Sequence, residues 1–189
     1  MATFLERAIG AARLDAATYE EVEADPTALG QAMAVVVVAS VAAGIGAGNP
    51  GLGMLGAVVF NLIAWYAWAF VTWWVGTRIL PEPTTESDIG EMLRVTGFSA
   101  APGVLGVLGV VPGVGGLAML ASSLWQLATM VVAVRQALDF TSTGRAIGVC
   151  LIGFLVYLAI LFVLITLFAG GVAALGGGAA GAGGGTVVP

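Results

Sequence analysis

The sequence contains no histidine, a single cysteine (Cys150), and few charges, since only 9% of its 189 residues are charged. Histidine is the usual general base near neutral pH and a frequent zinc ligand, so most hydrolytic and zinc chemistry lacks its customary side chain here. One cysteine excludes an intramolecular disulfide, and we expect Cys150 to be a buried apolar thiol. Soluble domains have about 25% charged residues, so this chain, with 59% hydrophobic residues, is predicted to have lipid as its solvent.

The charges gather in three clusters, and the stretches between and after them carry none: Glu6 to Asp25, Arg78 to Arg94 and Arg135 to Arg145. A membrane-spanning helix needs about 20 apolar residues. The first uncharged stretch is long enough for two helices, divided by the turn Gly48-Asn49-Pro50-Gly51. The second divides in the same way near Val111-Pro112-Gly113, because proline lacks an amide donor and glycine admits a tight reversal.

The sequence therefore predicts an all-α fold, an integral membrane bundle of five transmembrane helices. Their bounds are expected to be correct to about 2–4 residues, at roughly 29–47, 53–76, 95–111, 115–134 and 147–169. Three segments follow from this: a cytoplasmic acidic segment (1–25), a five-helix domain (26–169) and a flexible Gly/Ala-rich tail (170–189). The first 25 residues lack a continuous apolar core, so we expect no cleavable signal peptide.

All six basic residues are arginines, and they set the expected orientation. Loops on the cytoplasmic side of a membrane are enriched in arginine and lysine. With five spans, every arginine falls on one side, whereas four or six spans would break this agreement. The N-terminus is therefore predicted to be cytoplasmic and the C-terminus outside.

The N-terminal segment is predicted to form a short amphipathic helix, because Phe4, Leu5, Ala8, Ile9 and Ala12 recur at helical spacing. It could lie on the membrane surface or on the cytoplasmic loops. Two arginines against six acidic residues give residues 1–25 a net charge of −4. Anionic lipid headgroups and nucleic acid attract basic segments, so a protein partner, and no nucleic acid, is expected for this acidic face.

Small residues recur on the faces of two predicted spans. Ser40, Gly44 and Gly48 repeat every fourth position in the first, and Gly103, Gly106 and Gly109 repeat every third position in the third. Small side chains let helix backbones approach closely in lipid. We expect intramolecular packing at these stripes, with a homo-oligomer as the alternative.

Chemistry inside the spans is restricted to neutral groups, because no charged residue lies there. An intramembrane ionisable residue would indicate a proton relay, and its absence argues against proton-coupled transport. No catalytic, cofactor or metal site is predicted. Asn61 and Gln126 are expected to bond between helices, or to line a path for a neutral solute. The serines Ser99, Ser122 and Ser123 are expected to bond neighbouring carbonyls.

Pro102 is expected to kink the third span and to free a backbone carbonyl, which neighbouring residues must satisfy or a ligand could use. The third span is also expected to begin before the membrane, with Thr85 and Asp88 at capping-box spacing. Glu91 and Arg94 are placed for a weak ion pair. The loop carboxylates could alternatively bind a divalent cation, or serve an enzyme that acts on lipids.

A family resemblance adds to this interpretation. The stretch Gly97-Phe98-Ser99-Ala100-Ala101-Pro102 opens the third span, Val111-Pro112-Gly113 follows it, and Asp25-Pro26 precedes the first span. With five helices after an acidic N-terminus, the chain resembles the bacterial branch of the Yip domain family, the Ypt/Rab-interacting membrane proteins. The glycine-aromatic-x-x-x-proline element of that family matches Gly97, Phe98 and Pro102. Eukaryotic members engage Rab GTPases and one another through their cytoplasmic N-terminal regions.

The resemblance and the residues together favour a non-enzymatic membrane scaffold or accessory subunit in the cytoplasmic (inner) membrane of a bacterium. Its helices are expected to bind other membrane proteins or a larger membrane complex, and its acidic face a cytoplasmic partner. The alternative is a permeation protein for a small solute or ion. Candidate partner or packing positions are Gly44, Gly48, Asn61, Gly97, Phe98, Pro102 and Gln126.

Overall fold

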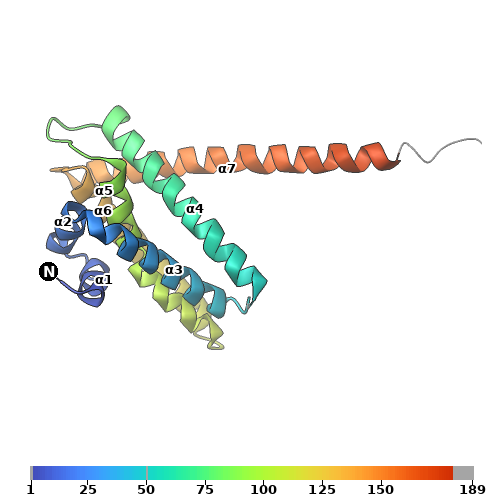
Figure 1. The fold of residues 1–189 in the computed structure, drawn as a ribbon, viewed down its shortest axis with the longest axis horizontal. Helices are drawn as coiled ribbons and strands as arrows, with labels where there is room; N and C mark the ends of the chain where they lie inside the picture. The colour runs from blue at the N-terminus through green and yellow to red at the C-terminus, as the bar shows by residue number, and fades with distance from the viewer. Residues whose placement is uncertain (1, 50, 181–189) are drawn as a thin grey trace, which may run out of the picture. The chain divides into compact units, whose positions relative to one another are not determined.

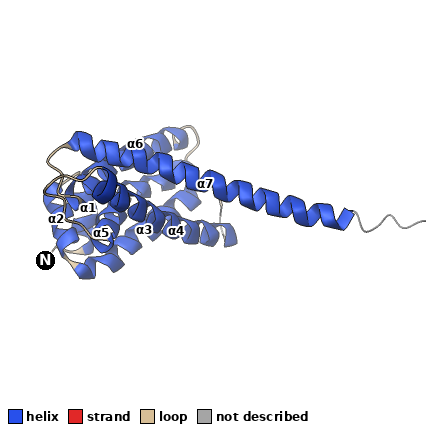
Figure 2. Ribbon diagram, turned by 90° about the horizontal axis from the view of Figure 1, so that it is seen from above, coloured by secondary structure: helices blue, strands red, loops and turns tan. Residues whose placement is uncertain are grey.

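The computed structural model describes residues 2–49 and 51–180, and throughout this part of the chain the regular structure is helical, without strands (Figure 2). Five helical stretches are long and apolar enough to cross a membrane, which confirms the predicted five-span all-α class. They are Pro26–Gly46, Leu52–Ile79, Ile89–Val110, Gly115–Ala137 and Thr143–Ile160. The orientation, with the N-terminus cytoplasmic, stays a prediction.

The contacts divide the chain into two units, Met1–Gly153 and Phe154–Pro189. The first unit contains every element up to the start of α7 (Thr143–Ala180), and the described part of the second is the remainder of that helix. The flexible tail predicted over 170–189 stays a prediction. Residues 170–180 are helical in α7, and residues 181–189 lie outside the described residues.

The N-terminal segment forms a helical hairpin, α1 (Phe4–Ala12) and α2 (Ala16–Ala24). The amphipathic helix was predicted, but α2 was not. A capping box between Thr3 and Glu6 begins α1, and Asp15 caps α2 by accepting a hydrogen bond from the Ala17 amide. Figure 1 shows both helices at the same end of the bundle, in blue.

The hairpin is held together by one buried guanidinium. Arg7 is 2% exposed, and its Nη2 lies 3.0 Å from Glu21 Oε1 and 2.8 Å from Asp25 Oδ2. Its Nη1 also donates to Gln31 Oε1 at the start of the first span. Buried Tyr19 donates to the Ala11 carbonyl oxygen at 3.1 Å. Two acids of the predicted acidic segment, Glu21 and Asp25, are therefore paired with Arg7 inside the fold.

The first two spans are joined by the predicted glycine turn. The short 3₁₀ helix η1 (Pro26–Ala28) leads into α3 (Leu29–Gly46), and α4 (Leu52–Trp74) follows the turn. Gly48 and Gly51 have φ angles of +68° and +74°, a region that glycine enters without the steric cost of a Cβ atom. A π-helical turn, η2 (Val75–Ile79), extends α4 at its far end and was not predicted.

The third span changes from an α-helix to a 3₁₀ helix near Pro102, where a break was predicted. It consists of α5 (Ile89–Ser99) and the 3₁₀ helix η3 (Ala101–Val110). Helix α5 begins before the predicted membrane boundary, as expected. The predicted capping pair was wrong, however: Asp88 pairs with Glu91 in the capping box, whereas Thr85 accepts a bond from the Glu82 amide. The turn at Gly113 (φ +81°) leads into α6 (Gly115–Ala137).

Small residues form the tightest contact in the bundle, between α3 and the third span, which run side by side in Figure 1. A Cβ atom added at Gly97 would lie 2.7 Å from Ala32 Cβ, and one at Gly103 would lie 2.9 Å from Ala39 Cβ. At Gly109, the added atom would lie 2.6 Å from the Gly46 carbonyl oxygen. Helix backbones that approach this closely leave no room for larger side chains.

Candidate functional site

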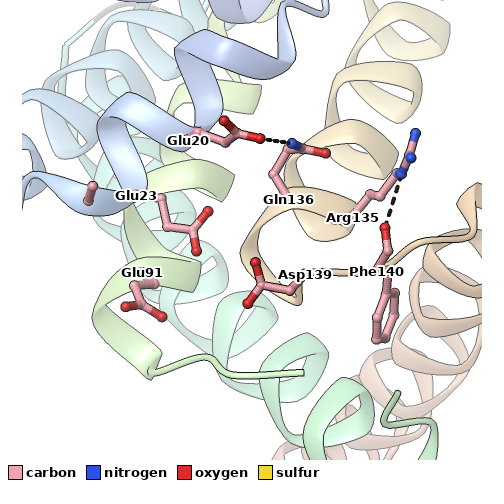
Figure 3. Close-up of a pocket in the computed structure, with 8 residues that line it drawn as sticks. Glu20, Glu23, Glu91, Arg135, Gln136, Asp139 and Phe140 are labelled. Carbon is pink, nitrogen blue, oxygen red and sulfur yellow. Dashed lines mark hydrogen bonds between the residues drawn. The ribbon is translucent and has the colours of Figure 1, made fainter. Parts of the chain in front are cut away.

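Four carboxylates surround a cavity of about 450 Å³ at the end of the bundle where the N-terminal hairpin docks. We call it the acidic pocket, and Figure 3 shows the carboxyl groups of Glu23 and Asp139 on two sides of a common space, with Glu91 nearby. Its lining residues come from three separate parts of the sequence: Glu20, Glu23, Ala24, Glu91, Arg135, Gln136, Asp139 and Phe140. The cavity is therefore a product of tertiary packing.

Local structure fixes each of these acids. Glu20 and Glu23 are three residues apart in α2, which places them on one face of that helix. Glu91 lies in the first turn of α5, where its carboxylate accepts from the Asp88 amide at 2.8 Å. Asp139 follows the end of α6 with a left-handed φ of +51°, a conformation that aspartate tolerates better than most residues.

Arg94 connects two sides of the pocket without neutralising a carboxylate. It is 8% exposed, and its Nε donates to the carbonyl oxygens of Val22 and Glu23 at 3.1 and 3.0 Å. Its Nη2 also donates to the Glu23 carbonyl. A cation at the C-terminal carbonyls of α2 is favourable because that end of a helix carries partial negative charge. The Glu91–Arg94 ion pair was wrongly predicted, since Arg94 reaches α2 instead.

The other arginine at the pocket, Arg135, is also directed to backbone and hydroxyl oxygens. Its Nε donates to the Phe140 carbonyl at 3.2 Å (dashed in Figure 3), and its Nη atoms donate to Thr141 and Thr143. Glu20 accepts from the Gln136 amide at 2.9 Å, which is a neutral donor. Within the described residues, no salt bridge joins the four pocket carboxylates to an arginine.

The pKa of Glu23 reflects this excess of negative charge. Burial is the largest cause that raises it, and the nearby Asp139 and Glu91 carboxylates raise it further. Arg94 opposes the shift, but the pKa still rises to about 8. A carboxyl group that binds its proton this tightly would be stabilised in its charged form by a cation placed beside it. The pocket is thus electrostatically suited to a cationic ligand.

Metal binding is not what the geometry favours. In the described ranges, no group of three or more His, Cys, Asp or Glu residues is placed to hold a metal ion. Three of the loop acids proposed for a divalent cation, Glu82, Asp88 and Glu91, have other partners. Glu82 Oε1 pairs with Arg145 Nε at 3.0 Å, and its Oε2 accepts from Thr141. Asp88 and Glu91 form the capping box that begins α5.

A second cavity, of about 260 Å³, lies inside the spans between α3, η3 and α6, and we call it the polar groove. Gln126 lies on its wall, and Gln126 Nε2 donates weakly to Ser122 Oγ at 3.3 Å. Ser122 in turn donates to the Pro102 carbonyl, and Thr129 Oγ1 donates to the Ser99 carbonyl at 2.7 Å. Residues 122, 126 and 129 therefore form a polar stripe along α6, opposite the point where the third span changes its winding.

The structure brings together four of the predicted positions. Gly97, Phe98 and Pro102 lie in sequence in the third span, where Phe98 is fully buried and Gly97 contacts Ala32. Gln126 is linked to Pro102 through Ser122. The predicted bonding of serines to carbonyls is confirmed, since Ser99 and Ser123 also donate to carbonyls of their own helices.

The three remaining predicted positions lie apart from this group. Gly44 is buried in α3 and faces α4, where an added Cβ would lie 3.0 Å from Met54 Cγ. Gly48 does not extend the stripe of Ser40 and Gly44, because α3 ends at Gly46 and Gly48 lies in the turn. Asn61 is half-buried on α4 and is not among the residues lining the polar groove with Gln126.

The acidic pocket was missed as a site. All its charged residues were recognised as lying on one side of the membrane, but the sequence does not show which of them converge. The sequence offered one indication of this site: Glu20 and Glu23 lie at helical spacing within residues 16–24, which have no apolar periodicity of their own.

Comparison with known proteins supports the family resemblance. The family model of the Yip1 domain matches residues 15–165, which covers α2 to α6 and most of the described part of α7. No curated protein and no solved structure matches the chain significantly.

Proposed function

The chain belongs to the Yip1 domain family, and from this premise we propose that it is a non-enzymatic membrane scaffold or accessory subunit. The family consists generally of non-catalytic membrane proteins, and five apolar helices make this member a multi-pass membrane protein in contact with the lipid bilayer. The cytoplasmic membrane of a bacterium is part of the proposal as its location.

One observation carries the proposal most directly: the acidic pocket holds four carboxylates, and among the described residues none of them forms a salt bridge with an arginine. Burial first, and repulsion from the neighbouring carboxylates second, raise the pKa of Glu23, and a bound cation relieves the repulsion. A lysine or arginine side chain of a cytoplasmic protein supplies that cation, and a cavity of about 450 Å³ has room for one or two such side chains.

The orientation supports a cytoplasmic partner. The pocket lies among the segments that contain the arginines: Arg94 docks on α2, Arg135 lines the cavity, and Arg145 pairs with Glu82 in the same region. Arginine-rich ends of membrane helices face the cytoplasm. The pocket therefore opens to the compartment where soluble partners with basic segments are found.

Other membrane proteins are proposed to contact the helices within the bilayer. The polar groove presents Gln126 beside small residues of α3 and η3. Glutamine side chains and small residues both promote association of helices in membranes, because they allow interhelical hydrogen bonds and close backbone approach. A second copy of this chain is one such partner, which would make the protein a homo-oligomer.

The test is affinity purification in native lipid particles, comparing the wild type with a double variant, Glu23→Gln and Asp139→Asn. We expect a protein partner with a basic segment to co-purify stoichiometrically with the wild type and to be lost from the variant. Glu86→Gln is the matched control, because Glu86 is an exposed acid outside the pocket. Binding should also weaken as salt is raised.

The opposite outcome is equally clear. A partner retained by the double variant, or lost equally from Glu86→Gln, would mean that the acidic pocket is not the contact site. A protein that purifies alone under all these conditions would contradict the accessory-subunit function itself.

Permeation of a small solute or ion is the alternative, favoured by the polar groove inside the spans. Its test is flux into liposomes that contain the purified protein. Flux abolished by Gln126→Leu or Asn61→Leu supports this alternative, and no flux above protein-free liposomes eliminates it.

A further inference from the structure

A third cavity, of about 240 Å³, lies between α1 and the spans α3 and η3, and its lining is apolar. We call it the apolar groove. On one side are Phe4, Leu5 and Ile9 of α1, and on the other Val35 and Val38 of α3 and Val104 of η3. The α1 side chains remain substantially exposed, at 40% for Phe4, 64% for Leu5 and 42% for Ile9. Something apolar must cover them.

The depth of the groove can be judged from the span that forms its wall. Val38 lies nine residues after Leu29, the first residue of α3, which corresponds to about 14 Å along the helix axis. The hydrocarbon core of one leaflet is about 15 Å thick, half of the usual 30 Å. Helix α1 therefore lies alongside the part of α3 that crosses the leaflet nearest the acidic pocket.

The surface of the groove continues into the lipid-facing surface of the spans. Val38 is 50% exposed and Val104 is 46% exposed, and both belong to helices that are long and apolar enough to cross the bilayer. Exposed valines at this depth contact acyl chains rather than water. The exposed side chains of α1 lie beside them and share that environment.

The backbone of α1 has the hydrogen bonding that lipid requires. The last four carbonyls of a helix have no partner within it, and they accept from capping groups, from tightened turns or, where available, from water. In α1 all four are satisfied by the protein. The Ile9 and Gly10 carbonyls accept from the Arg13 amide, Ala11 accepts from the Leu14 amide, and Ala12 accepts from Trp125 Nε1 at 2.6 Å. An exposed indole of α6 thus bonds the end of α1 in mid-span.

The charges of α1 fit the same position. Arg7 is buried against Glu21 and Asp25, so its charge does not face lipid. Glu6 and Arg13 are exposed and do not line the groove, and helical spacing places each of them beside Ile9. The helix therefore directs an apolar edge to the acyl chains, as an interfacial helix does.

We propose that α1 is embedded in the leaflet on the side of the acidic pocket, and that the apolar groove is occupied by an acyl chain of a bilayer phospholipid. The N-terminal helix is then part of the membrane-bound surface, and only α2 and the loops face the cytoplasm.

The test uses the full-length chain in phospholipid nanodiscs, with Cys150→Ala and single spin labels at Leu5→Cys or Ile9→Cys. Collision with oxygen, which concentrates in acyl chains, is compared with collision with a water-soluble nickel chelate. We expect labels at 5 and 9 to be accessible to oxygen and shielded from nickel, like a label at Val38→Cys. A label at Ala17→Cys, exposed on α2, should show the reverse.

Two outcomes overturn the proposal. Labels at 5 and 9 that meet nickel as freely as the label at 17 would show that α1 lies in water. Labels shielded from both reagents would show that protein, such as a second copy of this chain, covers the groove instead of lipid. The occupant itself is probed by a fluorophore at Leu5→Cys: phospholipids brominated on their acyl chains should quench it, and its persistence unquenched would contradict the lipid assignment.

Discussion

Ser122 Oγ donates a 3.0 Å hydrogen bond to the carbonyl oxygen of Pro102, across the interface of two spans. Pro102 is the second residue of the 3₁₀ helix η3, and its carbonyl lies where the third span changes from α-helical to 3₁₀ winding. Both residues are buried. In lipid, such a carbonyl has no water to accept from, so the hydroxyl of α6 is its substitute.

Ser122→Ala should lower the stability of the folded bundle by about 0.6–2 kcal/mol, the range of an interhelical bond in a membrane. The variant leaves the Pro102 carbonyl without its donor. Ser123→Ala is the matched control, because Ser123 is exposed and, in the described part of the chain, its hydroxyl bonds only the Met119 carbonyl of its own helix. Thermal unfolding in detergent measures both, and equal midpoints for the two variants would contradict the assigned role of Ser122.

Gly109→Ala should destabilise the contact between α3 and η3 by about 1–3 kcal/mol, the usual cost of overpacking. The added methyl meets the Gly46 backbone at 2.6 Å, and backbone cannot rotate away. Gly56→Ala adds the same methyl to α4 where, beyond the neighbouring backbone of the helix itself, no atom of the described residues lies within 4 Å. It should be neutral or slightly stabilising, since alanine favours helix. A Gly109→Ala protein as heat-stable as Gly56→Ala would show that the close approach is not present in the membrane.

Arg7→Gln should loosen the N-terminal hairpin without unfolding the spans. The change leaves Glu21 and Asp25 without their cation, and the hydrogen bond from Tyr19 to the Ala11 carbonyl remains between α1 and α2. Amide hydrogen exchange over residues 2–24 should accelerate by on the order of tenfold, while exchange in α6 stays unchanged. The control is Arg13→Gln, whose exposed side chain makes no ion pair among those in the described residues. Uniform protection in both variants would mean that Arg7 does not hold α1.

The free energy of unfolding should fall as the pH rises towards the raised pKa of Glu23. Its pKa is about 4.5 when unfolded and about 8 when folded, so between these values the folded state binds more protons. Stability therefore decreases with each rise in pH across that window, and it is highest below it. We expect a midpoint about 2–4 °C lower at pH 8.5 than at pH 5.5, a reduced effect because Glu23 is half-exposed and solvent screens its charge.

The variant Glu23→Gln should flatten this pH dependence, and Glu86→Gln should leave it intact. Other groups that face Glu23 and affect its titration come from α2, α5 and the end of α6: Glu20, Glu91, Arg94 and Asp139. A profile equally steep in the wild type and in Glu23→Gln would assign the effect to one of these instead.

Features that depend on local sequence were predictable. The turns at Gly48 and Gly113, the change of winding near Pro102 and the bonding of serines to carbonyls each follow from one residue type and its backbone chemistry. The five spans follow from the gaps between charges. Even the amphipathic edge of α1 was visible from the spacing of its apolar residues.

Features that depend on distant contacts were not predictable. Helix α2 has little apolar periodicity and is fixed by Arg94, whose backbone partners lie more than 70 residues away in the chain. The sequence suggested Glu91 as the partner of Arg94, because spacing along the chain reveals only contacts within one helix. The true partners of Arg94 lie in α2. The acidic pocket depends on the same docking of α2, so its four acids remained scattered charges until the fold brought them together.

The 3₁₀ winding of η3 turns a three-residue repeat into a straight column. A 3₁₀ helix has 3.0 residues per turn, so Gly103, Gly106 and Gly109 lie directly above one another along one edge. In an α-helix, with 3.6 residues per turn, the same glycines would spiral by about 60° at each step and spread over about 120° of the helix surface. The three-residue spacing of the glycines thus matches the three-residue turn of the 3₁₀ helix. A variant that restored α-helical winding after Pro102 would rotate part of this column away from α3 without changing any of the glycines.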